Sequence, residues 1–275
     1  MQQLQFGLKR AATERAAFVM GIVNVTPDSF YKESRGGIER ALKLIDEGAD
    51  ILDIGGESTR PGYTPVSIDE EIARIIPVIQ AVRKVSSIPI SIDTTKLEVF
   101  KSAFACGADI WNDVTALSGA GKSNADGTAS SEAEPSREAA QFIAKTGASV
   151  ILMHTGPGNS KEVSDFLGQR TVFCLSNGVS SDKIILDPGI GFGKTNEENF
   201  ALIKEPLSIC AGRYPVLMAL SRKRCIGEMT GRPAEERLAG TLAADMISVQ
   251  KGAKIIRVHD VSAAIDTLNV MKFLR

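Results

Sequence analysis

Short apolar runs alternate with longer amphipathic stretches along most of the 275-residue chain. Each run is four to eight residues long and rich in Ile, Val and Leu, which is typical of strands buried on both faces. Eight such runs occur, at Phe18–Val25, Asp50–Ile54, Ile88–Ile92, Asp109–Val114, Ser149–Met153, Lys183–Leu186, Pro215–Leu220 and Ala253–Val258.

The stretches between these runs have the period of helices. Within Ser67–Lys84, isoleucines recur at spacings of three and four, and Ser67 and Glu70 have the spacing of a capping box. Ala234–Lys251 and Val261–Leu274 show the same pattern. Eight strands that alternate with about eight helices predict an α/β fold, a single (β/α)8 TIM barrel spanning residues 1–275 as one domain. An open, doubly wound sheet is the alternative.

The charge is balanced, with 32 basic against 33 acidic residues, and gives no reason to expect a nucleic-acid or membrane-surface partner. No run of eighteen apolar residues is present, and the N-terminal residues lack the pattern of a secretory signal. The four cysteines, Cys106, Cys174, Cys210 and Cys225, lie far apart and form no CxxC pair. They are expected to be free thiols, which predicts a cytoplasmic location.

Polar residues follow every predicted strand at the same end. In chain order the strands end at Asn24, at Asp53, at Asp93, at Asn112 and Asp113, at His154, at Asp187, at residues 221–223 and at residues 257–260. Active sites of (β/α)8 barrels form at the C-terminal ends of the strands. We therefore expect these side chains to surround one site.

Several of these residues also fit structural roles. Asp93 has the context of a helix N-cap, and Asn112 and Asp187 have that of turn residues. His154 fits a packed ring as well as a site residue. The basic triplet at 222–224 would usually be solvated, but it follows an apolar strand, so we expect it to point into the mouth of the barrel.

The glycine-rich segment 189–195 (GIGFGKT) resembles a phosphate-binding loop but fits neither common pattern. A Walker motif would need glycine at Pro188, and the spacing GxGxG differs from the dinucleotide-binding GxGxxG. The glycines are expected to permit tight turns and the close approach of a flat ligand.

The predicted site combines acidic and basic groups. Asp93, Asn112 and Asp187 suit a heterocycle with several N–H donors, because a carboxylate accepts two hydrogen bonds from adjacent ring and amino groups. Asn24 offers an oxygen ligand of the kind that Mg²⁺ accepts beside substrate phosphates. Positive charge for an anionic group such as a phosphate comes from Arg60, Lys223, Arg257 and His259.

Motifs at the strand ends closely resemble those of the dihydropteroate synthase family of pterin-binding barrels. They are NVTPDSF at 24–30, DIGGESTRPG at 53–62, SIDT at 91–94, ND at 112–113, LMH at 152–154, LDPGIGFGK at 186–194, SRK at 221–223 and RVHD at 257–260. The resemblance implies a transferase of folate biosynthesis, the target of sulfonamides. This family joins 6-hydroxymethyl-7,8-dihydropterin pyrophosphate to p-aminobenzoate, giving 7,8-dihydropteroate and pyrophosphate. It also implies Mg²⁺ as cofactor and a homodimer.

The resemblance further implies roles for individual residues. The pterin ring would be held by Asp93, Asn112, Met153, Asp187, Lys223 and Arg257. The pyrophosphate would be held by Asn24, Thr59, Arg60, Arg257 and His259, with Asn24 contributing to Mg²⁺ binding. The p-aminobenzoate would lie against Phe30, Pro61, Phe192 and Ser221, its carboxylate at the helix start after Lys223. Catalysis would rest on Arg60, Lys223, Arg257 and His259, and loops 26–37 and 57–66 would close over the site.

Two features depart from the family pattern. Lys32 stands where many members have an aspartate after NVTPDSF, which makes Glu33 the candidate replacement in loop closure. Residues 119–134 are small and polar, and have the composition of a mobile surface insertion with no assigned role.

Three other functions stay open at this point. The Lys32 departure is compatible with a pterin-binding paralogue that lacks catalytic activity. A methyltransferase that uses methyltetrahydrofolate and a corrinoid protein shares the pterin-holding carboxylates, but it has no need of the STRPG and SRK segments. A phosphate-handling barrel aldolase would use Lys223 as a Schiff-base lysine.

Overall fold

The computed structural model describes residues 1–25, 36–57, 66–119 and 134–274. Eight parallel strands form one sheet in the order β8-β7-β6-β5-β4-β3-β10-β9. A parallel bridge between Leu186 and Val216 brings the two edge strands together, so the sheet forms a nearly closed barrel. The strands are β3 (Phe18–Asn24), β4 (Ile51–Gly55), β5 (Ile90–Asp93), β6 (Ile110–Asp113), β7 (Ser149–Met153), β8 (Ile184–Asp187), β9 (Leu217–Met218) and β10 (Ile255–Val258). The predicted barrel is confirmed, and the open sheet is excluded.

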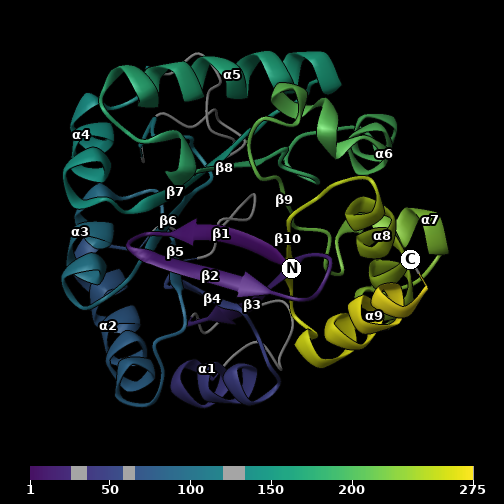
Figure 1. The fold of residues 1–275 in the computed structure, drawn as a ribbon, viewed down its shortest axis with the longest axis horizontal. Coiled ribbons are helices and arrows are strands. Elements are labelled where there is room, and N and C mark those ends of the chain that lie inside the picture. The colour runs from purple at the N-terminus through teal and green to yellow at the C-terminus, as the bar shows by residue number, and fades with distance from the viewer. Residues whose placement is uncertain (26–35, 58–65, 120–133, 275) are drawn as a thin grey trace.

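Helices connect the strands and surround the barrel (Figure 1). They are α1 (Gly37–Asp46), α2 (Ile68–Val85), α3 (Leu97–Ala105), α4 (Arg137–Thr146), α5 (Ser160–Ser176), α6 (Asn196–Lys204), α7 (Arg224–Thr230), α8 (Leu238–Gln250) and α9 (Val261–Phe273). Within the described ranges, none of them combines the length and the apolar character that crossing a membrane requires.

The start of α2 shows how local sequence sets an element boundary. The Ser67 hydroxyl accepts a hydrogen bond from the Glu70 backbone N–H at 3.2 Å, as the cap prediction required. The reciprocal half of a capping box does not form here, because the Glu70 carboxylate accepts from Arg74 instead. The helix then buries Ile75 and Ile79 against the sheet.

Two predicted elements differ from the structure. The strand expected over Pro215–Leu220 shortens to the two residues of β9, since a turn follows in which the Lys223 N–H donates to the Leu220 carbonyl. The helix expected over Ala234–Lys251 is divided into a 3₁₀ turn, Ala234–Glu236, and α8. The division falls at Arg237, whose guanidinium turns back to the carbonyl oxygens of Arg222 and Arg232.

An N-terminal β-hairpin, which the sequence patterns did not predict, lies across the ring of strands (Figure 1). Its strands are β1 (Gln2–Phe6) and β2 (Lys9–Thr13), paired antiparallel and joined at Gly7 and Leu8. Gly7 has a φ of +57°, and a Cβ there would lie 2.9 Å from the Asp109 carbonyl oxygen. Glycine is therefore required both by the turn and by the close approach to the barrel.

The hairpin closes the N-terminal end of the barrel. Phe6 is fully buried and joins the inward-facing side chains of the strands, which include Phe18, Met20, Ile110 and Ile255. The Gly7 N–H donates to the Ser149 hydroxyl at 2.9 Å, just at the start of β7. This end lies opposite the strand ends at which the polar residues gather, so the hairpin has a structural role.

We expect Phe6→Leu to destabilise the protein without changing turnover per folded molecule. The substitution removes the edge-to-face contact with Phe18, whose ring centre lies 5.4 Å away. The free energy of unfolding should fall by about 1–2 kcal/mol. Urea unfolding measures the first effect and turnover corrected for folded protein the second. A selective loss of turnover would contradict the assignment of the hairpin to structure.

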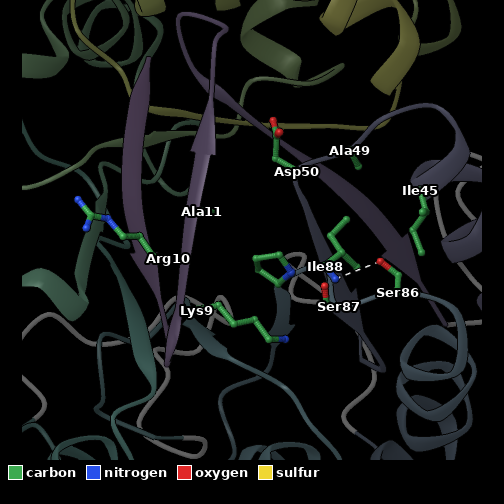
Figure 2. Close-up of a pocket in the computed structure, with 10 residues that line it drawn as sticks. Lys9, Arg10, Ala11, Ile45, Ala49, Asp50, Ser86, Ser87 and Ile88 are labelled. Carbon is green, nitrogen blue, oxygen red and sulfur yellow. Dashed lines mark hydrogen bonds between the residues drawn. The ribbon is translucent and has the colours of Figure 1, made fainter.

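A pocket with a cavity volume of about 590 Å³ lies beside the hairpin (Figure 2). It is lined by residues of β2 and by the segments that lead into β4 and β5, including Asp50 and Ser86. Its charged groups have partners: Lys9 pairs with Asp109 at 2.9 Å, and Asp50 with Arg15 at 2.6 Å. The pocket lies at the N-terminal ends of the strands and takes no part in the site described below.

Candidate active site

The polar residues predicted from the sequence come together at the C-terminal edge of the barrel. Strand register places Asn24 beside Gly55, Gly55 beside Asp93, and Asp93 beside Asn112. On the next pair of strands, Met153 is the register partner of Asp187. Parallel register therefore brings Asn24, Asp93, Asn112 and Asp187 to one edge of the barrel from segments far apart in the chain.

Arg257 links the carboxylates on one side of this edge. Its Nε donates to Asp53 Oδ2 at 2.6 Å, and its Nη2 donates to Asp93 Oδ2 at 2.8 Å. Asn112 Nδ2 also donates to Asp53 Oδ2, at 3.1 Å. The guanidinium is thus held by two charge-assisted hydrogen bonds, which fix the plane of its fork.

Two carboxylate oxygens in this cluster are buried and have no hydrogen-bond partner within the described residues: Asp53 Oδ1 and Asp93 Oδ1. Burial raises the pKa of Asp93 to about 7, against the opposing effect of Arg257. A buried acceptor without a donor costs free energy, so such atoms usually mark a place where a ligand or water donates. Asp93 Oδ1, on the less deeply buried of the two residues, suits a ligand that carries an N–H group.

Asp187 and Lys223 lie at the same edge of the barrel, on the side opposite Asp53 and Asp93. Asp187 Oδ1 accepts from the Gly189 N–H at 2.7 Å, and burial raises the pKa of its carboxyl while the charge of Lys223 lowers it. The Lys223 ammonium donates to the Ile190 carbonyl and lies 4.8 Å from the centre of the Phe192 ring. Burial lowers the pKa of Lys223 to about 8.

Ser221 and His259 form a pair beside Lys223. Ser221 Oγ lies 2.8 Å from His259 Nδ1 and accepts from the His259 backbone N–H at 3.2 Å. Arg40 donates to the His259 carbonyl from α1. The polar pair is buried, so its orientation is set by the packed ends of β9 and β10.

His154 is a packed ring in this structure. Its ring meets Phe166 edge-on with centres 5.1 Å apart, and its Nδ1 lies 3.0 Å from the Lys194 ammonium. Burial lowers the pKa of His154 to about 4, so the imidazole is neutral and accepts the hydrogen bond. Lys194 also donates to the carbonyls of His154, Gly156 and Gly189 and thereby connects the two loops that follow β7 and β8.

The basic triplet at 222–224 does not point into the barrel mouth as a unit. Only Lys223 reaches the site; Arg222 is buried against Asp260, and Arg224 is exposed. The expectation is wrong for Arg222 and Arg224 because the backbone turns at Arg222, with a φ of 56°.

Two contributions of described residues were missed from the sequence. The sequence patterns identified Asp53 only as the end of a strand, although its place at the start of the DIGGESTRPG motif could have identified it as a site residue. They assigned no role to Lys194. Several predicted site residues lie outside the described residues: Phe30, Lys32, Glu33, Thr59, Arg60 and Pro61. Residues 120–133 of the predicted insertion at 119–134 also lie outside them.

The fold and this cluster define a (β/α)8 barrel whose C-terminal end gathers hydrogen-bond acceptors next to positive charge, the chemistry that a nitrogen heterocycle with an anionic group requires. Asp53, Asp93 and Asp187 supply the acceptors, and Lys223 and Arg257 supply the positive charge. Comparison with known proteins agrees with this class. A family model described as "Pterin binding enzyme" matches residues 20–259.

Individual relatives narrow the class further. Dihydropteroate synthase of Haemophilus influenzae is 41% identical over 269 residues, with 92% of each chain covered. The structure of Xanthomonas albilineans dihydropteroate synthase with 4-aminobenzoic acid has a TM-score of 0.85 at 39% identity, covering 99% of this chain and 97% of that one. The same enzyme in complex with 7,8-dihydropteroate has a TM-score of 0.82 at 36% identity, covering 99% and 98%.

The chain belongs to the pterin-binding enzyme family, and within it to the dihydropteroate synthases. The predicted family and transferase class are confirmed. The methyltransferase and aldolase alternatives are set aside, because relatives of this similarity carry the synthase name.

Proposed function

We propose that this site joins 6-hydroxymethyl-7,8-dihydropterin pyrophosphate to p-aminobenzoate, releasing pyrophosphate and 7,8-dihydropteroate. The observation that carries the proposal is the pair of buried, unpartnered oxygens of Asp53 and Asp93 beside Arg257. A pterin has ring N–H and amino donors on one edge, and a carboxylate oxygen that lacks a donor, such as Asp93 Oδ1, can accept from such a group. The relatives bound to 4-aminobenzoic acid and 7,8-dihydropteroate support the same substrates.

The pterin lies among Asp93, Asn112, Met153 and Asp187 in this proposal. Arg257, fixed by Asp53 and Asp93, presents the face of its guanidinium to the ring. Lys223 donates to the pterin carbonyl from the side of Phe192. Opposed acidic and basic groups orient the ring, so that its methylene faces the second substrate.

The pyrophosphate is held by Arg257 and His259, together with Asn24, Thr59 and Arg60. Positive charge at this position stabilises the negative charge that develops as the carbon–oxygen bond to pyrophosphate breaks. Departure of pyrophosphate leaves a cationic methylene that the electron-rich pterin stabilises. The neutral arylamine then forms the new carbon–nitrogen bond and loses a proton to solvent, so no strong general base is required.

The donors present fit a Mg²⁺ ion that is held mainly by substrate phosphates. Asn24 offers one amide oxygen at the end of β3, and the described residues contain no group of three His, Cys, Asp or Glu side chains that could hold a metal by themselves. Mg²⁺ commonly takes one or two protein oxygens plus phosphates and water. When bound, the ion would neutralise charge on the leaving pyrophosphate.

The p-aminobenzoate binds against Phe192, Phe30 and Pro61. Its carboxylate is received by Ser221 and by the chain at the start of α7, after Lys223. The Ser221 hydroxyl already lies against His259 at 2.8 Å, which orients it for a carboxylate oxygen.

Pterin affinity should fall about tenfold between pH 8 and pH 6. The pKa of Asp93 is raised to about 7 chiefly by burial, so its carboxyl is largely protonated at pH 6 and loses acceptor capacity for pterin N–H groups. Titration calorimetry with a pterin lacking the pyrophosphate measures this. The dependence of pterin affinity on pH should be weaker in Asp93→Asn. An unchanged affinity of the wild type between pH 8 and pH 6 would show that Asp93 does not titrate in this range.

The direct test is pyrophosphate release by the purified protein with dihydropterin pyrophosphate, Mg²⁺ and p-aminobenzoate, each omitted in turn. Release that depends on p-aminobenzoate and yields dihydropteroate supports the proposal. Pterin binding without release would identify an inactive paralogue and direct attention to Lys32.

We further propose a single-domain chain that acts as a homodimer in the cytoplasm. Exposed apolar side chains on neighbouring helices α8 and α9 support a dimer, among them Ile247, Val270 and Phe273. All four cysteines are free thiols, which suits a reducing compartment. Sedimentation velocity tests the dimer, and Val270→Lys should weaken it if this face is used.

A further inference from the structure

Arg222, which lies between Ser221 and Lys223, has a backbone conformation that arginine rarely adopts. Its φ is 56°, in the left-handed region. It lies within a tight turn that the Lys223 N–H closes by donating to the Leu220 carbonyl at 3.1 Å. Glycine is the usual residue for such a position, because a Cβ disfavours it. Surrounding contacts must therefore hold Arg222 in this state.

The Arg222 side chain makes an unusually complete set of contacts. Its Nε and Nη2 donate to the two carboxylate oxygens of Asp260 at 3.0 and 3.1 Å. Its Nη1 donates to the carbonyls of Ala234 and Glu235 at 3.1 and 2.6 Å. The side chain is 5% exposed. A bidentate ion pair of this kind fixes both the position and the plane of the guanidinium.

The backbone of Arg222 is held as well. Its N–H donates to Thr241 Oγ1 at 3.0 Å, and its carbonyl accepts from Arg237 Nη1 at 3.1 Å. Hydrogen bonds of both the main chain and the side chain of Arg222 thus hold the turn against α8 and against the segment before α8.

The Arg222–Asp260 pair continues the register of the barrel beyond its last backbone hydrogen bonds. Partners on β9 and β10 are 38 residues apart, and so are Ser221 and His259, and Arg222 and Asp260. Two side-chain links therefore hold the strand ends together where the backbone ladder has stopped. The first link consists of residues assigned to substrate, and the second follows it by one residue on each strand.

We propose that Arg222 is a positioning residue whose ion pair with Asp260 maintains the left-handed turn between Ser221 and Lys223. The turn directs Ser221 towards His259 and Lys223 towards Ile190 and Phe192, on two sides of the site. The role rests on the proposed reaction, since its consequence is the placement of the groups that receive p-aminobenzoate and the pterin carbonyl.

Two variants remove the ion pair, one from each partner. Asp260→Asn keeps the shape of the partner but removes its charge, and Arg222→Gly permits a positive φ while removing the anchor. Asp266→Asn, an exposed carboxylate on α9, is the matched control. We expect KM for p-aminobenzoate to rise at least fivefold and kcat to fall in both test variants, with neither change in the control. The double variant should be no worse than Arg222→Gly alone.

Two results would overturn the proposal. One is an unchanged KM for p-aminobenzoate in either Asp260→Asn or Arg222→Gly. The other is a loss of kcat that only matches the loss of folded protein, followed by circular dichroism, because that indicates a structural contact. Wild-type turnover is measured in parallel, so a protein that does not catalyse the reaction at all is recognised as a failure of the proposed function instead.

Discussion

Arg257→Met is expected to lower turnover by roughly a hundred- to a thousandfold and to destabilise the fold. The substitution removes the donor to Asp53 and Asp93, at 2.6 and 2.8 Å, and leaves two buried carboxylates without their shared cation. Breaking a buried ion pair by removing one partner typically costs about 3–5 kcal/mol. The free energy of unfolding should fall by an amount of this order near neutral pH.

The loss of stability should increase with pH. The pKa of Asp93 is already raised to about 7 by burial, and removing Arg257 raises it further. A carboxyl group whose pKa is higher in the folded than in the unfolded state lowers the stability of the protein as the pH rises above the pKa of the unfolded state. Urea unfolding at pH 6 and pH 8 should therefore show the larger deficit at pH 8.

Arg232→Met is the control for the Arg257 variant. Arg232 is an exposed arginine whose partner is Glu236 at 2.9 Å, so its removal should change stability by less than about 1 kcal/mol. Turnover close to wild type in Arg257→Met would show that the guanidinium lies outside the reacting site.

Asp187→Asn is expected to weaken pterin binding ten- to a hundredfold while leaving the fold intact. Asparagine keeps an acceptor for the Gly189 N–H but replaces the second carboxylate oxygen with a donor, which opposes a pterin N–H. Hydrogen bonds to charged groups contribute about 1.5–3 kcal/mol, which corresponds to this range. Fluorescence or calorimetric titration with the pterin gives the affinity.

Asp182→Asn is the matched control, because Asp182 is an exposed carboxylate just before the same strand. It should bind pterin as the wild type does. If Asp187→Asn also bound pterin at wild-type affinity, the assignment of the end of β8 to the pterin pocket would be wrong.

Much of the architecture could be read from local patterns. Each apolar run predicted a strand within a few residues, because strands buried on both faces must be continuously apolar. The polar residue after each run could also be placed, since parallel strands bring their C-terminal ends to one edge. The motifs around Asp93, Asn112 and Asp187 added the chemistry of the ligand.

The N-terminal hairpin could not be predicted in the same way. Its strand sequences, QQLQF and KRAAT, are short and mostly polar, and only Leu4, Phe6 and Ala11 contribute to the apolar packing. The signal for its position is the close fit of Gly7 against Asp109, which exists only once the barrel has formed.

The sequence by itself determined the barrel class, the family and which strand ends carry polar groups, because these depend on periodicity and on motifs within single segments. Only the tertiary structure decided how those groups pair. Arg257 meets Asp53 from 204 residues away, and Arg222 turns from the site to Asp260 while its neighbour Lys223 turns towards it. Partners of this kind are selected by packing and by the requirement that buried charges be matched, and neither acts along a single segment of chain.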